Sequence, residues 1–119
     1  MSPESDAKDC IFCKIVKGEI PSDIIYQDEA VLVFPDINPA TPVHLLVIPK
    51  EHIPSLADLD ESHMGILDRM VNAAKIAARE KGIAESGYRV CINNGPDAGQ
   101  VVPHLHMHLL GGRSLGWSH

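Results

Sequence analysis

The stretch Pro103-His104-Leu105-His106-Met107-His108-Leu109-Leu110 carries most of what the sequence predicts about the fold. Side chains alternate between the two faces of a β-strand, so three histidines would line one face while Leu105, Met107 and Leu109 line the other. At a rise of about 3.3 Å per residue the outer two histidines lie about 13 Å apart, whereas Zn–N bonds are only about 2 Å long. A single metal ion therefore cannot bind all three. At least one imidazole is left for other chemistry, as a nucleophile or a base.

A structural explanation competes with this functional one. Single histidines in strands are usually surface or hydrogen-bonded residues. Three of them on one face, backed by three large apolar side chains, favour a functional site. His63, expected on an exposed helical turn, and His119, at the end of the chain, keep the structural interpretation.

Length and composition predict one ordinary globular domain. The chain has 119 residues, of which 45% are apolar and 22% charged. We expect residues 1–8 to form a disordered polar tail and residues 9–119 to form the domain. The formal net charge of −6 and the lack of a Lys/Arg cluster argue against a nucleic-acid polymer as ligand, but a small nucleotide fits. No apolar run approaches the length of a membrane span and the polar start is not a signal peptide, so a cytoplasmic protein is expected.

The N-terminal half predicts a short helix and three strands. Asp9 would cap a helix over 10–16 that ends at Gly18. Residues 24–26 and 31–34 are expected to form a hairpin, and the proline-rich stretch 35–42 is a loop. A third strand follows over 44–48.

The C-terminal half predicts one long helix and two strands. The helix would begin after Asp58 and Asp60 and end at Gly82. Its expected apolar stripe consists of Met64, Leu67, Val71, Ala74 and Ala78. A strand over 88–93, a glycine-bearing loop over 94–100 and the histidine strand complete the chain. The sum is an α+β fold: an antiparallel meander of about five strands with the helix on one face and a ligand on the other.

With these motifs in view, the chain resembles the histidine triad (HIT) family, in its Hint branch. The match runs from about Cys10 to Trp117, and its strongest piece is His104-Leu105-His106-Met107-His108 followed by Leu109-Leu110-Gly111-Gly112-Arg113. Supporting pieces are Ile11-Phe12-Cys13-Lys14-Ile15, Phe34-Pro35-Asp36-Ile37-Asn38-Pro39, His44 to Ile48 with Pro49-Lys50-Glu51-His52-Ile53, Asn93-Asn94-Gly95, and Gly99-Gln100. The resemblance implies a HIT-like sheet of five antiparallel strands with one long helix and a short N-terminal helix.

The resemblance also implies an activity, the hydrolysis of purine nucleoside 5′-phosphoramidates at the P–N bond. His106 matches the nucleophile that attacks the α-phosphorus and becomes transiently nucleotidylated; His44 and His108 match groups that contact the phosphate. The remaining nucleotide-binding matches are Asp36 for the ribose hydroxyls, Asn93, Gly99 and Gln100 near the phosphate, and Ile11, Phe12 and Ile37 for the purine.

The chemistry of these residue types agrees with such roles. An imidazole with a pKa near 6.5 attacks phosphorus without a strong base, and a covalent intermediate divides one difficult displacement into two easier ones. From the residues alone, Asp36 is equally well explained as a solvated loop carboxylate or a cap, Asn93 as a turn former and His44 as a strand-end histidine.

The chain departs from the Hint pattern at Val101, where many Hint proteins have a serine after Gly-Gln. A hydroxyl that could hydrogen-bond the leaving group is missing. The protonation of a departing amine, and with it the strength of a phosphoramidase activity, becomes an open question at this position.

Cys10 and Cys13 suggest a second site. They fit half of a tetrahedral zinc site, and the resemblance supplies His52 and His104 as the other two ligands of a structural zinc. The alternative is a reduced, partly buried pair that binds nothing. Cys91, within a strand, is expected to be a buried apolar residue.

The resemblance further implies a homodimer in which the two chains join their sheets through the long helix and the strand over 88–93. The C-terminal segment 111–117 of one chain would reach the partner's site, where Trp117 could stack on a substrate; a frayed tail is the alternative. Three functions remain open from sequence: a nucleotidyl-histidine hydrolase, with dinucleoside polyphosphates as its second substrate class; a zinc hydrolase; and a non-catalytic nucleotide-binding scaffold.

Overall fold

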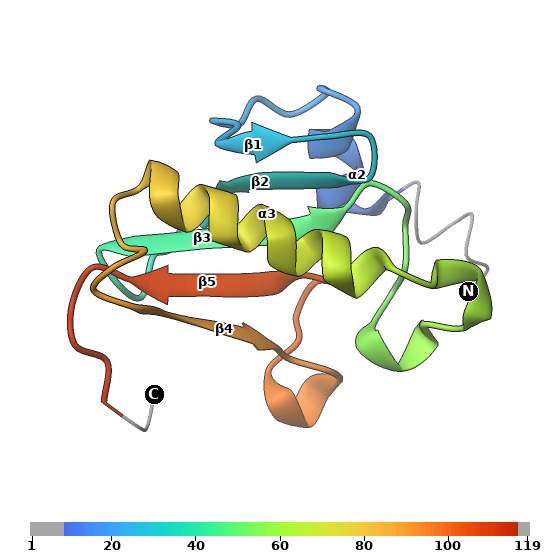
Figure 1. Cartoon of the computed structure of the whole chain (residues 1–119). Helices are drawn as coiled ribbons and strands as arrows, with labels where there is room; N and C mark the ends of the chain where they lie inside the picture. Colours follow the sequence, from blue (N-terminus) through green and yellow to red (C-terminus); the bar gives the residue numbers. More distant parts are fainter. Residues whose placement is uncertain (1–8, 117–119) are drawn as a thin grey trace.

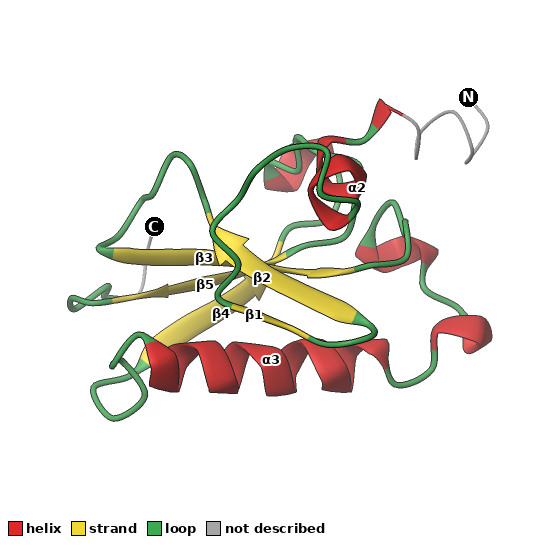
Figure 2. Ribbon diagram, turned by 90° about the horizontal axis from the view of Figure 1, so that it is seen from above, coloured by secondary structure: helices red, strands yellow, loops and turns green. Residues whose placement is uncertain are grey.

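A five-stranded antiparallel sheet with a helix on each face forms the molecule. The computed structural model describes residues 9–116, so the expected tail over 1–8, and Trp117 and His119, lie outside the described residues. The strands are β1 (Tyr26–Gln27), β2 (Val31–Pro35), β3 (Val43–Pro49), β4 (Tyr88–Ile92) and β5 (Met107–Gly111). Figure 2 shows the long helix α3 (Ile66–Glu80) on one side of the sheet and the short helix α2 (Ile11–Val16) on the other. The α+β class is confirmed.

The strand order is β1-β2-β3-β5-β4, with every neighbouring pair antiparallel. It differs from a simple meander because the last strand, β5, inserts between β3 and β4 (Figure 1). The connection from β3 to β4 runs through α3, which carries the chain across the sheet and leaves β4 at an edge. The histidine-bearing strand therefore lies inside the sheet, where its backbone is paired on both sides.

The sheet has an apolar layer on both faces. Alternate residues of the central strands pack against α3, among them Val31, Val33, Leu45 and Val47. The residues between them, including Leu32, Phe34, Leu46 and Ile48, pack against α2. This explains why β2 and β3 are nearly continuous apolar runs, and it places α2 directly over the face that carries the histidines.

Helix α3 buries a different stripe from the one that the sequence predicts. Met70 and four alanines, Ala73, Ala74, Ala77 and Ala78, contact the sheet. The prediction is right for Ala74 and Ala78 and wrong for Met64, Leu67 and Val71, which are exposed. Small side chains let a helix approach a sheet closely, so the alanine face is the buried one. Leu67 and Val71 are left on the outer surface.

Helix α2 begins one residue later than expected. Cys10, not Asp9, is its N-cap, and the Cys10 Sγ accepts a hydrogen bond from the backbone N–H of Cys13 at 3.4 Å. Gly18 follows the helix with a positive φ of 78°, as its predicted role at the C-terminal end requires.

The histidine segment enters the sheet later than predicted. Strand β5 begins at Met107, and His104 lies in a bend, where its N–H donates to the Val102 carbonyl oxygen. The N–H of Leu105 instead donates to the carbonyl oxygen of Ile53, outside the sheet. Leu105, Met107 and Leu109 still pack in the α3 core, so the predicted apolar back of the segment is confirmed.

Among residues 9–116, no helix combines the length and the apolar character needed to cross a membrane.

Candidate functional site

A cavity of about 520 Å³ opens on the α2 face of the sheet. Helix α2 forms one wall, the loop after β2 a second, and the loop between β4 and β5 a third. Nine residues predicted for the site line it: Ile11, Phe12, Asp36, Ile37, Asn93, Gly99, Val101, His106 and His108. The fold thus brings to one cavity residues that the resemblance had assigned, one by one, to the nucleotide site.

Sequence reasoning missed about half of the lining. The additional residues are Ile15, Ile20, Pro21, Ser22, Phe34, Pro35, Asn38, Leu46 and Val102. Ile15 lies one helical turn after Ile11, and Phe34 and Leu46 occupy the face of their strands opposite α3, so spacing could have indicated these three. The segment 20–22 has no comparable pattern, and only the fold brings it to the cavity.

The orientation of His106 is fixed by its own segment. Its Nδ1 lies 2.7 Å from the carbonyl oxygen of His104, so Nδ1 carries the proton and donates it. In a neutral His106 the Nε2 atom therefore keeps its lone pair. Phe12 packs edge-on against the ring at a centroid distance of 5.2 Å, and the residue is only 8% exposed. The arrangement fixes the tautomer of the neutral imidazole and holds the ring tightly in place.

His44 lies behind His108 and is absent from the cavity lining. Its Nδ1 accepts the backbone N–H of Ala40 at 2.9 Å, so a neutral His44 carries its proton on Nε2. That atom is 2.9 Å from His108 Nδ1 and 3.4 Å from Asp36 Oδ2. His108 Nδ1 then acts as the acceptor, which leaves the proton of a neutral His108 on Nε2. His44 thereby sets the tautomer of His108.

Burial lowers the pKa of His44, while the nearby negative charge of Asp36 opposes that shift. A protonated Nδ1 would also face the Ala40 N–H, donor against donor. Both effects favour the neutral ring that the hydrogen bonds require.

Gln100 is one of the loop residues expected near the phosphate. Its side chain does not line the cavity. Its Oε1 accepts the N–H of Gly95, and its Nε2 donates to the carbonyl oxygens of Pro54 and Val102. The amide is turned inward because it satisfies backbone groups of the loop. Gln100 thus fixes the shape of the segment that carries Gly99 and Val101, without reaching into the cavity.

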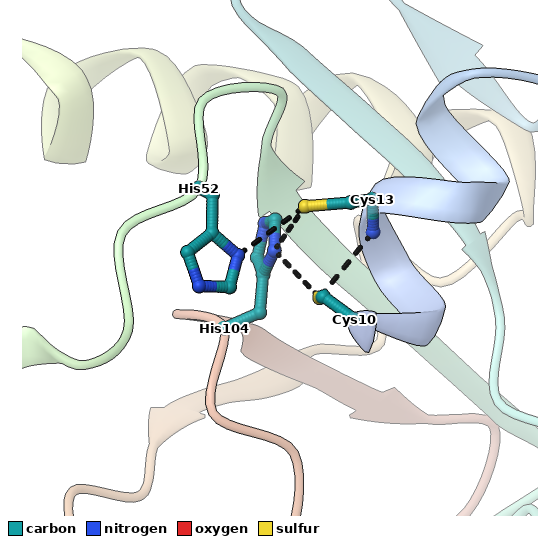
Figure 3. Close-up of side chains that lie close together, drawn as sticks. All are labelled: Cys10, Cys13, His52 and His104. Carbon is teal, nitrogen blue, oxygen red and sulfur yellow. Dashed lines mark hydrogen bonds between the residues drawn. The ribbon is translucent and has the colours of Figure 1, made fainter. Parts of the chain in front are cut away.

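The four predicted zinc ligands converge from three separate segments (Figure 3). Cys10 Sγ lies 3.3 Å from His104 Nδ1, and Cys13 Sγ lies 3.2 Å from His52 Nδ1 and 3.6 Å from His104 Nδ1. Tetrahedral bonds of about 2.0 Å to nitrogen and 2.3 Å to sulfur place neighbouring ligand atoms about 3.3–3.8 Å apart. The donor set and its spacing therefore fit Zn²⁺.

The surroundings of His104 also fit a metal ligand. Its Nε2 donates to the Pro49 carbonyl oxygen at 2.9 Å, so Nδ1 keeps the lone pair that faces both sulfur atoms. Burial lowers the pKa of His104 to about 4, which keeps the ring neutral. Burial and the hydrogen bond with Cys10 raise the pKa of the Cys13 thiol to about 11. A bound cation would favour the thiolate that this environment otherwise disfavours.

Residues 9–116 match the family described as "Scavenger mRNA decapping enzyme C-term binding". A purine nucleoside phosphoramidase of Escherichia coli (strain K12) is 50% identical over 110 residues, which cover 92% of both chains. A 14 kDa zinc-binding protein of Zea mays is 49% identical over 94% of this chain and 88% of its own length. An adenylylsulfatase of Arabidopsis thaliana is 46% identical over 90% of this chain and 74% of its own length.

Solved structures of similar sequence share the fold of this chain. A HIT family hydrolase from Clostridium thermocellum superposes with a TM-score of 0.91 at 52% identity, covering 93% of this chain and 96% of that one. A zinc-bound histidine triad family protein from Mycobacterium smegmatis superposes with a TM-score of 0.76 at 38% identity, covering 90% and 77%. The fold and the histidine cluster define a histidine triad protein. The chain belongs to the HIT family and is a Hint-like member of it.

Proposed function

We propose that this HIT protein is a hydrolase that cleaves purine nucleoside 5′-phosphoramidates through a nucleotidyl-histidine intermediate. One observation carries the proposal: the Nδ1 atom of His106 donates to the backbone, which leaves Nε2 of the neutral ring as the nucleophilic nitrogen in a cavity that combines an apolar wall with Asp36. The phosphoramidase of Escherichia coli at 50% identity supports the substrate class.

In the first step, His106 Nε2 forms a bond to the α-phosphorus while the bond from phosphorus to the amine nitrogen breaks. The amine leaves with that electron pair and takes up a proton. In the second step, water attacks the same phosphorus, its proton is released, and the bond to Nε2 breaks to give the 5′-mononucleotide. The first displacement leaves His106 nucleotidylated, and the second returns it to its starting state.

The other residues serve binding and proton placement in this proposal. Ile11, Phe12 and Ile37 flank the purine, and Asp36 accepts hydrogen bonds from the ribose hydroxyls. His108 carries a proton on Nε2 and donates it toward the phosphoryl oxygens, where charge accumulates. The cysteines with His52 and His104 hold a structural zinc, as their fit to a closed four-ligand site favours.

The position of His104 argues against a zinc hydrolase. His104 belongs to the buried cysteine cluster, whereas His106 and His108 line the cavity. A catalytic zinc keeps one coordination position open to water or substrate, but the four side chains of this cluster would fill a tetrahedral shell.

Val101 favours adenylyl sulfate as a second substrate class. Its side chain is 88% exposed at the cavity and offers no proton donor. An amine must be protonated as it leaves, whereas sulfate leaves as a stable anion. Attack by His106 on the α-phosphorus is the same in both cases, and the Arabidopsis thaliana relative is an adenylylsulfatase.

A hydrolysis panel tests the proposal. It compares adenosine and guanosine 5′-phosphoramidates, adenylyl sulfate, a diadenosine polyphosphate and an unrelated phosphodiester. We expect phosphoramidates to be cleaved fastest and the phosphodiester not at all. A rapid alkaline quench during turnover, analysed by mass spectrometry, should find the nucleotidyl adduct on the peptide that contains His106. Turnover without any adduct, or nucleotide binding without hydrolysis, would reject the proposed chemistry.

A further inference from the structure

The metal cluster and the nucleotide cavity share helix α2. Cys10, its N-cap, and Cys13 belong to the cluster, while Ile11, Phe12 and Ile15 line the cavity. The helix has only six residues, so its two sets of side chains cannot shift independently. Figure 3 shows both sulfur atoms turned from this helix toward the two imidazoles.

The second connection runs through the candidate nucleophile. The carbonyl oxygen that fixes His106 Nδ1, at 2.7 Å, belongs to His104, a member of the cluster. The His104 ring is completely buried and is anchored at its other nitrogen by Pro49. A rotation of the His104 peptide would therefore disturb the cluster and the His106 tautomer together.

Phe12 makes the third connection. Its ring packs edge-on against His104 at 5.7 Å and against His106 at 5.2 Å, measured between ring centroids. One aromatic side chain thus contacts a cluster histidine and the candidate nucleophile, and it also lines the cavity.

Part of the cluster lacks the bonds that would hold it without a metal. The Nε2 atom of His52 is buried and has no hydrogen-bond partner among the described residues. The two sulfur atoms contact the imidazoles only through weak thiol hydrogen bonds of 3.2–3.6 Å. A metal-free cluster is expected to sample other side-chain arrangements, and α2 would follow it.

From these contacts we propose that His104 and Phe12 are positioning residues that couple metal binding at the cluster to nucleotide binding in the cavity. Zn²⁺ raises the affinity for a purine mononucleotide by holding α2 and His106 in place. The nucleotide raises the affinity for Zn²⁺ by the same factor, because binding free energies are linked reciprocally. This inference rests on the proposed function, since it takes AMP as a ligand of the cavity.

The test measures both directions of the linkage. AMP is titrated calorimetrically into zinc-loaded protein and into protein stripped by a chelator, whose folding is checked by circular dichroism. We expect AMP to bind the loaded protein on the order of tenfold more tightly. Zinc affinity, measured by competition with a chelating dye, should rise by the same factor when AMP is saturating.

Two variants test whether Phe12 carries the coupling between metal binding and nucleotide binding. Phe12→Leu keeps all four metal ligands and is expected to reduce the coupling factor to less than half of the wild-type value. Lys14→Ala changes the same helix at a residue outside both sites and should leave the factor unchanged. Equal loss of coupling in both variants would overturn the role given to Phe12.

If the metal-free protein unfolds, a spectroscopic measurement tests the coupling instead. In protein loaded with Co²⁺ in place of Zn²⁺, AMP should shift the visible ligand-field bands. An unchanged spectrum at saturating AMP, or equal AMP affinity with and without zinc in folded protein, overturns the coupling. Failure of AMP to bind the loaded protein at all would instead count against the proposed function.

Discussion

At the scale of single residues, the site depends on which nitrogen of each histidine carries the proton. Backbone groups decide this for two of them: the His104 carbonyl oxygen for His106 and the Ala40 N–H for His44. The tautomer of His108 follows from that of His44. In the proposed mechanism these three histidines have different roles: His106 is the nucleophile, His108 the donor and His44 the positioning residue.

His106→Ala should abolish turnover while the fold and AMP binding persist. Removing a nucleophile typically costs at least about a thousandfold in kcat, whereas the apolar wall of the cavity is unaffected. Steady-state kinetics and AMP calorimetry measure the two effects. His63→Ala, at a histidine outside the cavity, is the matched control. A variant at position 106 that keeps a substantial rate would transfer the chemistry to another residue.

Asp36→Asn should lower the pKa of His44 further. The negative charge of Asp36 opposes the lowering caused by burial, so its removal makes protonation of His44 harder. The His44 ring signal in an NMR titration should then move at lower pH than in the unmodified protein. The sign follows from charge alone, and a titration shifted to higher pH would contradict the assigned His44–Asp36 interaction.

At the scale of secondary structure elements, α3 and β5 show that residue spacing predicts whether an element forms better than it predicts which face is buried or where the element begins. Periodicity correctly predicts the long helix, but the face it buries is set by how closely the helix approaches the sheet. For the histidine segment, alternation correctly predicts the apolar back. It fails at the start of the strand, because Leu105 bonds to Ile53, a residue far away in sequence.

Ala77→Leu should destabilise the protein by about 1–3 kcal/mol, the usual cost of overpacking a core. Ala77 is fully buried on the face of α3 that contacts the sheet, so the added atoms of leucine must push the helix away from the sheet. Denaturant unfolding measures the change. Asn72→Leu, on the exposed face of the same helix, is the control and should change stability by less than about 0.5 kcal/mol. Equal effects at both positions would contradict the buried alanine face.

At the scale of the whole molecule, helix α3 and strand β4 each leave apolar side chains exposed. Leu67 and Val71 on α3, and Tyr88 and Val90 on the edge strand β4, are each between 36% and 45% exposed. These are the elements through which Hint-like chains are expected to pair, and a second copy of the chain would cover them.

We predict a homodimer in solution that is broken by Val90→Asp. The new carboxylate would be placed at an apolar interface, where its burial without a partner is costly. Analytical ultracentrifugation should show a dimer for the unmodified chain and a monomer for the variant, whereas Arg79→Asp should remain dimeric.

A second test removes residues 117–119. The truncated chain should lose rate selectively with bulky aromatic amine leaving groups, and unchanged substrate preference would refute the role proposed for Trp117.

Zinc should support the fold more than the chemistry. Cys13→Ser is expected to lose one bound metal per chain and to unfold at a lower temperature than the unmodified protein, because the cluster joins α2 to two distant segments. Elemental analysis and thermal unfolding measure the two effects, with Cys91→Ser as the control that keeps its metal. Metal-free protein of unchanged stability would remove the zinc assignment.

The residues alone predict the antiparallel strands, the two helices and the apolar back of the histidine segment, because these follow from local periodicity and turn residues, which are properties of short stretches of chain. The resemblance to the HIT family added nine residues that line the cavity. Only the tertiary structure decided the insertion of β5 between β3 and β4, the inward turn of Gln100, and the placement of His44 behind His108. Those depend on contacts between residues tens of positions apart, whose geometry is set by packing and by the hydrogen bonds that buried polar groups form.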